Sequence, residues 1–477
     1  MSLDRSIIRR STARIRTACD DERRYRGTLF NLSGHRAETR LDSAQSLRSC
    51  AMTFPLAPAG AILWRSFCRQ EPGRRNTMSR SSIALGNLRA IVIIIVLAFH
   101  SVLPYLASLP AAPYRFDSAP YRWLAFPIVD SQRWFGFDLV CAWQDVSLMA
   151  LMFFLSGLFV SPSLERKGTW KFLSDRLLRI GVPCVLAIIF LMPIAYYPAY
   201  RATAADPSVN TYWRHWLSLP FWPTGPQWFL CQLLALTLFV AVLRRLAPRW
   251  SERLSQRVAY VGQNPLRFFV ALVFSSAVAY VPLALAYSPL AWVNIGAVSF
   301  QLSRPLCYLV YFLFGFAVGG CDLDHGLLAC DGALARGWLA WLTAAIICFV
   351  LWALPTSATM TDWSAAPLVL KLAAALGFVA ACAAGSMFLL AVCLRFACGR
   401  TRAFDSLSTS AYGMYLVHYP FVVWLQYSLL GVKLFAIGKA AIVFGGALTM
   451  SWAVTAAMAG MPLVAKLIAT RRRMSDA

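Results

Sequence analysis

The sequence has 477 residues, of which 59% are hydrophobic and 14% are charged, and its formal net charge is +24. This composition excludes a water-soluble globule, because there is too little polar side-chain surface to cover one, and it indicates an all-α polytopic membrane protein. Nucleic-acid binding is not expected, because the arginines and lysines lie between apolar segments rather than in one patch. The 13 cysteines include no CxxC pair, so neither a metal site nor a disulfide framework is predicted.

The first 80 residues differ from the rest of the chain. They are rich in arginine, contain no lysine and include no apolar run long enough for a signal peptide or a membrane span. Two interpretations stay open: a disordered basic cytoplasmic tail held near anionic lipid, or an upstream extension of the reading frame, with translation starting at Met78. We assign no function to residues 1–80 under either interpretation.

The remaining chain contains about ten apolar segments of the length that a bilayer requires. Loops such as 161–176 and 397–407 carry arginine or lysine, whereas 288–303 and 355–366 carry neither. By the positive-inside rule this pattern places both termini in the cytoplasm, including a basic tail at 466–477, and it indicates a multi-pass protein of a bacterial-type inner membrane. The expected spans are 84–107, 137–160, 177–198, 227–246, 266–287, 304–320, 336–354, 367–396, 408–430 and 434–459.

The first span carries two strongly polar side chains, Arg89 and His100, within the apolar stretch Leu88 to Leu106. They are eleven residues apart, so they lie on one helix face and about 16 Å apart along the axis. Arg89 is expected near the membrane surface and His100 within the hydrocarbon layer. An ionisable group at that depth indicates a functional site, and the alternative is a histidine that only bonds a neighbouring helix.

Two later spans also carry charged residues. Asp145 in the second span needs a cationic or hydrogen-bonding partner at membrane depth, and His100 on the adjacent antiparallel span is the expected one. Arg176 and Arg179 lie three residues apart at the cytoplasmic end of the third span. They are either topology anchors or a pair that binds phosphate, which guanidinium groups can hold bidentately.

Two outside loops, 108–136 and 199–226, are long and aromatic. Tryptophan and tyrosine at this level usually form an interfacial belt. The alternative is a mouth in which aromatic faces stack against a carbohydrate. The candidate residues for such a mouth are Trp123, Trp134, Trp213 and Trp222.

Five motifs in chain order resemble the membrane acyltransferase-3 family. They are NLRAIVIIIVLAFHS in the first span, MFFLSGLFV (152–160), RLLRIGVP (176–183), GPQWFLCQLL (225–234) and SAYGMYLVHYPFVVW (410–424). RLLRIGVP and YLVHYP are especially similar to the branch that succinylates periplasmic glucans. One departure is that the Gly-Val-Asp common before the second motif reads Ala150, Leu151 and Met152 here. The resemblance implies an acyltransferase domain over residues 81–465.

The resemblance implies transfer of an acetyl or succinyl group from cytoplasmic acyl-CoA to a hydroxyl of an extracytoplasmic glycan or glycolipid. No bound cofactor is expected, since acyl-CoA is the donor substrate. A sugar hydroxyl needs a base to take its proton, and a neutral imidazole has suitable basicity. We expect His100 to be that base, with Asp145 fixing its tautomer. Arg89 is the third expected catalytic residue.

The same resemblance suggests where the two substrates bind. Arg89, Arg176 and Arg179 lie where the phosphates of CoA would arrive, and the 16 Å from Arg89 to His100 is comparable with an extended pantetheine arm. The oxyanion needs a hydrogen-bond donor. The expected substrate-binding residues are Gln227, Trp228, Tyr415 and His418.

A secondary transporter is the alternative function. Ten spans with buried arginine, histidine and aspartate are equally typical of that class, although the sequence shows no internal repeat. The lipid bilayer is an expected partner under either function, and the oligomeric state stays open.

Overall fold

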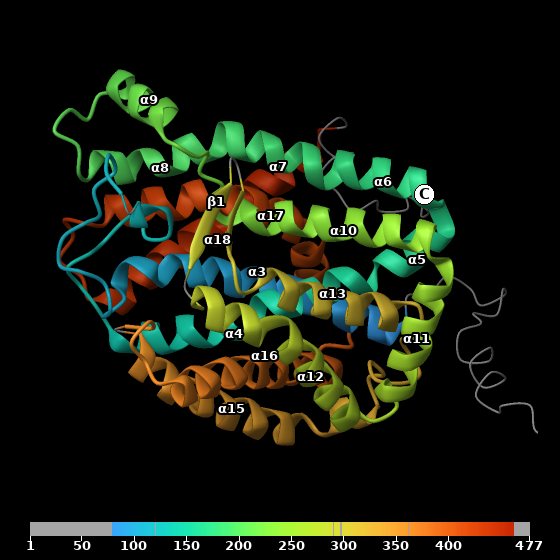
Figure 1. Cartoon of the computed structure of the whole chain (residues 1–477). Coiled ribbons are helices and arrows are strands. Elements are labelled where there is room, and N and C mark those ends of the chain that lie inside the picture. Colours follow the sequence, from blue (N-terminus) through green and yellow to red (C-terminus); the bar gives the residue numbers. More distant parts are fainter. Residues whose placement is uncertain (1–78, 120, 290, 296–297, 361, 462–477) are drawn as a thin grey trace, which may run out of the picture. The chain divides into compact units, whose positions relative to one another are not determined.

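The computed structural model describes residues 79–461, apart from positions 120, 290, 296–297 and 361. This part of the chain is almost entirely helical, as expected, with one short β-hairpin (Figure 1). The helices are α3 (Arg80–Val102), η1 (Leu103–Tyr105), η2 (Arg122–Leu124), α4 (Phe135–Leu158), α5 (Val160–Lys167), α6 (Thr169–Arg176), η3 (Leu177–Gly181), α7 (Val182–Leu186), η4 (Ala187–Leu191), α8 (Met192–Arg201), α9 (Val209–Ser218), η5 (Gly225–Gln227), α10 (Trp228–Leu246), α11 (Pro248–Gly262), α12 (Pro265–Tyr287), α13 (Pro305–Gly319), α14 (Ala333–Arg336), α15 (Trp338–Thr359), α16 (Leu368–Phe396), α17 (Arg402–Ser428) and α18 (Ala436–Ala459); the strands are β1 (Trp292–Ile295) and β2 (Val298–Gln301).

Within the described residues, eight helical segments are long and apolar enough to cross a membrane. This confirms a multi-pass helical membrane protein, although the expected count was about ten. The two other expected spans correspond to α13, which has only 15 residues, and α17, whose first half carries many polar side chains. The eight segments are Arg80–Tyr105, Phe135–Lys167, Thr169–Arg201, Gly225–Leu246, Pro265–Tyr287, Trp338–Thr359, Leu368–Phe396 and Ala436–Ala459.

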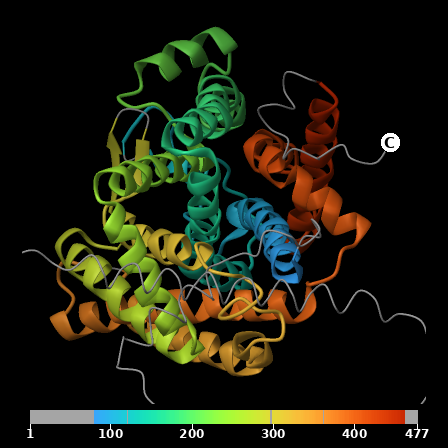
Figure 2. The same cartoon turned by 90° about the vertical axis from the view of Figure 1, so that its right-hand side faces the viewer.

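Helix α3 lies among the other helices and packs against α4, α16, α17 and α18. Its N-terminus is capped by Ser79, whose side chain accepts a hydrogen bond from the backbone N–H of Ser82. Apolar and small residues on several faces of α3 are buried, including Ala84, Leu88 and Val92. Figure 2 shows α3 (blue) beside α17 and α18 (orange to red). A polar side chain on α3 therefore meets other helices rather than lipid alone.

Glycines bring α4 and α13 into close contact. A Cβ atom added to Gly157 would lie 2.2 Å from the carbonyl oxygen of Phe312, and one added to Gly315 would lie 2.0 Å from that of Phe154. Gly319 is four residues later and is equally close to the backbone of Leu158. Small residues at this spacing let two membrane helices approach closely. This contact fixes how the side chains of α4 meet those of α13.

The third span is not a continuous α-helix. Two π-helical turns, Leu177–Gly181 and Ala187–Leu191, interrupt it, and Pro183 and Pro193 come soon after them. Proline removes a backbone N–H from the helical hydrogen-bond pattern, and π-helical turns often occur at functional sites. The first of these turns contains Arg179. The irregular backbone thus coincides with one of the expected phosphate-binding residues.

The two ends of the bundle differ. We call the end with the segments 103–134 and 202–224 the loop end; it is on the left of Figure 1. We call the opposite end, where α3 begins, the basic end; there α11 runs across the ends of neighbouring helices (Figure 1). The hairpin of β1 and β2, an antiparallel pair in which Trp292 faces Gln301, connects α12 and α13.

A disulfide corrects the expectation from the cysteine pattern. Cys330 and Cys398, 68 residues apart in sequence, are bonded to each other. The bond lies beside the start of α3, since Asn87 donates hydrogen bonds to the carbonyl oxygens of Ala397 and Gly399. This pair could not be predicted from the sequence, because neither cysteine belongs to a recognisable spacing pattern.

Candidate active site

His100 lies near the loop end of α3, and its side chain is half-buried. Its Nδ1 atom is 2.9 Å from the carbonyl oxygen of Val96, one turn earlier in the helix. A ring nitrogen in this position donates its hydrogen to the carbonyl, so the neutral imidazole keeps its lone pair on Nε2. The backbone carbonyl of His100 accepts a hydrogen bond from Nε2 of Gln426 at 2.7 Å. This bond ties α3 to α17 at the level of His100.

His418 of α17 is the second imidazole of the site. Its ring centroid is 5.1 Å from that of His100, and its side chain is completely buried. Its Nδ1 atom donates to the carbonyl oxygen of Tyr415 at 2.6 Å. Its Nε2 atom has no hydrogen-bond partner among the described residues. A buried polar atom without a partner is uncommon in folded proteins.

Asp145 does not pair with His100, which corrects that expectation. The carboxylate of Asp145 is held by Arg304, with Nη1–Oδ1 and Nη2–Oδ2 distances of 2.8 and 2.5 Å. The guanidinium is buried, whereas the Asp145 side chain is 41% exposed. Since Nδ1 of His100 already bonds a carbonyl of its own helix, no position remains on that nitrogen for a carboxylate. Asp145 therefore joins α4 to the start of α13.

Arg304 was missed by the sequence analysis, although a signal existed. An aspartate at membrane depth requires a cation, and Arg304 is the first residue of the expected span 304–320. The expected partner was instead a histidine of the neighbouring span. The glycine contact between α4 and α13 is what brings Asp145 to an arginine instead.

Gln227, Trp228 and Tyr415 lie where α10 begins against α17. Nε2 of Gln227 donates to the carbonyl oxygen of Leu416 at 3.1 Å, and the hydroxyl of Tyr415 donates to that of Pro226. Gln227 and Tyr415, two of the expected substrate-binding residues, are therefore already bonded to backbone carbonyls rather than free to donate to an oxyanion. The indole N–H of Trp228 makes no hydrogen bond within the described residues, and its ring stacks near Tyr308, 6.2 Å away.

Three arginines gather towards the basic end. Arg89 and Arg179 both lie near enough to Arg176 to repel its guanidinium electrostatically. Arg89 is exposed and lies 5.4 Å from the ring centroid of Phe159. In the part of the chain that the structure describes, none of the three arginines has a carboxylate within ion-pair distance. Asp175, which pairs with Lys167, is close enough to act electrostatically on Arg176 and Arg179. The cluster still has an excess of positive charge, which stabilises an anion.

The aromatic residues of the loop end divide into two groups. Trp123 is completely buried, is stacked on Phe116 at 4.2 Å and donates its indole hydrogen to the carbonyl of Phe116. It belongs to the core of the loop end and has no face free for a carbohydrate. The other three candidates, Trp134, Trp213 and Trp222, are 46%, 42% and 37% exposed.

The fold and this arrangement define a polytopic helical membrane protein with two histidines inside the bundle and an arginine cluster towards one end. A family model described as an acyltransferase domain matches residues 82–456. The chain belongs to the acyltransferase-3 family and is a membrane acyltransferase. No curated protein and no solved structure matched the chain. The matched region includes every expected site residue, and it favours acyl transfer over the transporter alternative.

Proposed function

We propose that this protein is an O-acyltransferase of the inner membrane that moves an acetyl or succinyl group from cytoplasmic acyl-CoA to a hydroxyl of an extracytoplasmic glycan or glycolipid. One observation carries the proposal. His100, with His418 at a centroid distance of 5.1 Å, lies on the same helix as Arg89, which belongs to the arginine cluster. The site thus pairs a base with an anion-binding region about 16 Å away along α3.

The arginine cluster suits the phosphates of CoA. Arg89, Arg176 and Arg179 would bind them at the basic end, which in the proposed topology faces the cytoplasm, as both termini do. The pantetheine arm would then extend along α3 and bring the thioester to His100. In this topology α13 and α17 complete ten spans, and the loop end faces the acceptor.

The chemistry follows from the tautomer of His100. Its Nε2 takes the proton of the acceptor hydroxyl while the hydroxyl oxygen attacks the thioester carbonyl. The tetrahedral intermediate then collapses, the C–S bond breaks, and the CoA thiolate takes the proton from the imidazolium. The products are the acylated acceptor and free CoA, and no acyl-enzyme is required.

Two neighbouring groups would assist these steps. Since Nδ1 of His418 carries its hydrogen, Nε2 of His418 can only accept a hydrogen bond, and it would accept one from a neighbouring hydroxyl of the acceptor, which would hold the reacting hydroxyl beside His100. The indole N–H of Trp228, which makes no hydrogen bond within the described residues, would be the donor that stabilises the oxyanion. Asp145 has no role in this scheme, because Arg304 occupies its carboxylate.

The experiment is a comparison of envelope glycans by mass spectrometry. Cells lacking the gene, cells complemented with the wild-type gene and cells complemented with His100→Ala are analysed for ester-linked acetyl and succinyl groups. We expect the ester only in the cells with the wild-type protein. Identical glycan masses in all three strains would contradict the proposal.

A further inference from the structure

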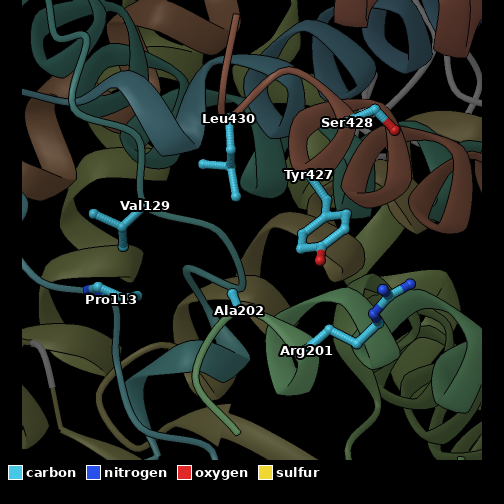
Figure 3. A pocket seen from close by; sticks show the side chains of 7 residues that line it. All are labelled: Pro113, Val129, Arg201, Ala202, Tyr427, Ser428 and Leu430. Carbon is cyan, nitrogen blue, oxygen red and sulfur yellow. The ribbon is translucent and has the colours of Figure 1, made fainter. Parts of the chain in front are cut away.

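A hollow of about 510 Å3 lies at the loop end (Figure 3). Three separate segments line it: Val129 from the connection between α3 and α4, Arg201 and Ala202 where α8 ends, and Tyr427 and Leu430 where α17 ends. This volume lies within the range of small-molecule sites. None of these residues belongs to the site around His100, so the hollow is a separate candidate.

Arg201 supplies the charge of the hollow. Its guanidinium carbon lies 5.9 Å from the ring centroid of Tyr197 and 5.7 Å from that of Tyr427, and Figure 3 shows the guanidinium beside the ring of Tyr427. Contacts of this kind hold a cation without neutralising it. The Arg201 side chain is exposed, so it remains accessible to a ligand.

No acid of the surrounding segments is available to Arg201. Segments 103–134 and 202–224 contain three aspartates, and each is engaged: Asp117 with an arginine, Asp130 with a buried lysine, and Asp206 with hydroxyl and N–H groups at the start of α9. Among the residues that the structure describes, Arg201 makes no ion pair. The hollow therefore carries an uncompensated positive charge.

The hollow adjoins the turn of α17 whose side chain bonds the backbone of His100 in α3. Tyr427 directly follows Gln426, whose amide donates to the carbonyl oxygen of His100 at 2.7 Å. A ligand resting on Tyr427 thus contacts the same helical turn that fixes the backbone of His100. The hollow and the expected base are connected through one residue.

We propose that this hollow binds a sugar unit carrying a phosphate or carboxylate, with Arg201 bonding the anionic oxygens. This inference rests on the proposed function, because it assigns the chemical class of the acceptor. A planar guanidinium can hold two oxygens of such a group at once. Apolar side chains such as Val129 and Leu430 offer surface for the C–H faces of the sugar ring.

The test measures binding rather than turnover. The full-length protein is placed in nanodiscs of neutral phosphatidylcholine, and its unfolding temperature is followed while glucose 6-phosphate or glucose is added. We expect glucose 6-phosphate to raise the unfolding temperature with an apparent Kd at least about tenfold below that of glucose. Arg201→Gln should remove this difference, and Arg201→Lys should retain part of it. Arg214→Gln is the matched control, since Arg214 is an exposed arginine of α9 outside the lining of the hollow.

Two results would overturn the assignment. One is a response to glucose 6-phosphate that Arg201→Gln leaves unchanged. The other is an Arg201-dependent stabilisation by phosphatidylglycerol nanodiscs with none by glucose 6-phosphate, which would make the hollow a lipid-headgroup site. Acyl transfer is measured separately in the same preparation. Transfer without Arg201-dependent binding would refute only the acceptor class, whereas binding without any CoA-dependent transfer would refute only the proposed function.

Discussion

The imidazoles of His100 and His418 lie 5.1 Å apart between ring centroids, and each donates its Nδ1 hydrogen to a carbonyl of its own helix. Within the described residues, neither Nε2 atom has a hydrogen-bond partner. His100 is half-buried and His418 is completely buried. In the proposed reaction the first is the base, and the second accepts a hydrogen bond from a neighbouring hydroxyl of the acceptor.

The variants His418→Asn and His418→Gln test the roles of Nδ1 and Nε2 of His418 separately. The asparagine amide can replace the Nδ1 donor to Tyr415 but leaves nothing at Nε2, whereas glutamine places an acceptor oxygen near Nε2. We expect His418→Asn to lower the single-turnover rate roughly tenfold or more, as for a lost hydrogen bond that positions the acceptor, and His418→Gln to retain more activity. Equal unfolding temperatures serve as the folding control. A wild-type rate in His418→Asn would exclude a role for Nε2.

Arg179→Ala tests the arginine cluster. Removal of one phosphate ligand should raise the KM for acyl-CoA about tenfold and leave the KM for the acceptor nearly unchanged, because the interaction is with the donor only. Arg166→Ala is the control, since Arg166 is an exposed arginine of α5. Steady-state kinetics with each substrate varied in turn gives both values. An equal rise in the two KM values would argue against a phosphate role.

Asp145→Asn tests the ion pair with Arg304. The buried guanidinium loses its counterion, so the free energy of unfolding should fall by about 1–3 kcal/mol, less than for a fully buried pair because Asp145 is 41% exposed. Thermal unfolding measures the loss. The double variant Asp145→Leu with Arg304→Met should recover much of it. Loss of activity in a fully stable single variant would show instead that Asp145 acts in catalysis.

The pair Cys330–Cys398 tests the proposed topology. It lies at the basic end, which the topology exposes to the cytoplasm, and the cytoplasm keeps thiols reduced. Although the two sulfurs are bonded in the structure, we expect the cytoplasm to keep the pair reduced, so that both cysteines are alkylated when intact cells are treated with a permeant thiol reagent and the bond re-forms on oxidation. Mass spectrometry of the labelled peptides distinguishes the states. Full oxidation of the pair in cells would place this end outside the cytoplasm.

The sequence predicted well what depends on local pattern. Apolar runs of span length predict helices because the bilayer requires them, and the eleven-residue spacing of Arg89 and His100 predicts a shared face because the helical period is fixed. The motifs predicted the family, which is confirmed. The number of spans could not be counted from length and apolarity alone, because α13 is short and the first half of α17 is polar. Both helices are sheltered by other helices, so neither needs the length and apolarity of a lipid-facing span.

What the sequence did not predict depends on contacts between distant segments. The predicted partner of Asp145 was wrong, because the glycines of α4 and α13 determine which helix lies next to Asp145. The disulfide joins two loops 68 residues apart, and the hollow around Arg201 is assembled from three segments. Trp123 was a candidate for an aromatic mouth because its loop is long and aromatic, yet it fills the core of the loop end.

The central claim is that His100 is the base for acyl transfer. The most direct measurement is CoA-dependent transfer of a radiolabelled acyl group to the acceptor in membrane vesicles containing wild-type protein, His100→Ala or the control His325→Ala, in which an exposed histidine paired with Asp322 is changed. We expect a rate lower by a factor of about 10²–10⁴ for His100→Ala, with the wild-type rate for His325→Ala and equal protein in all vesicles. A wild-type rate for His100→Ala would exclude His100 as the base.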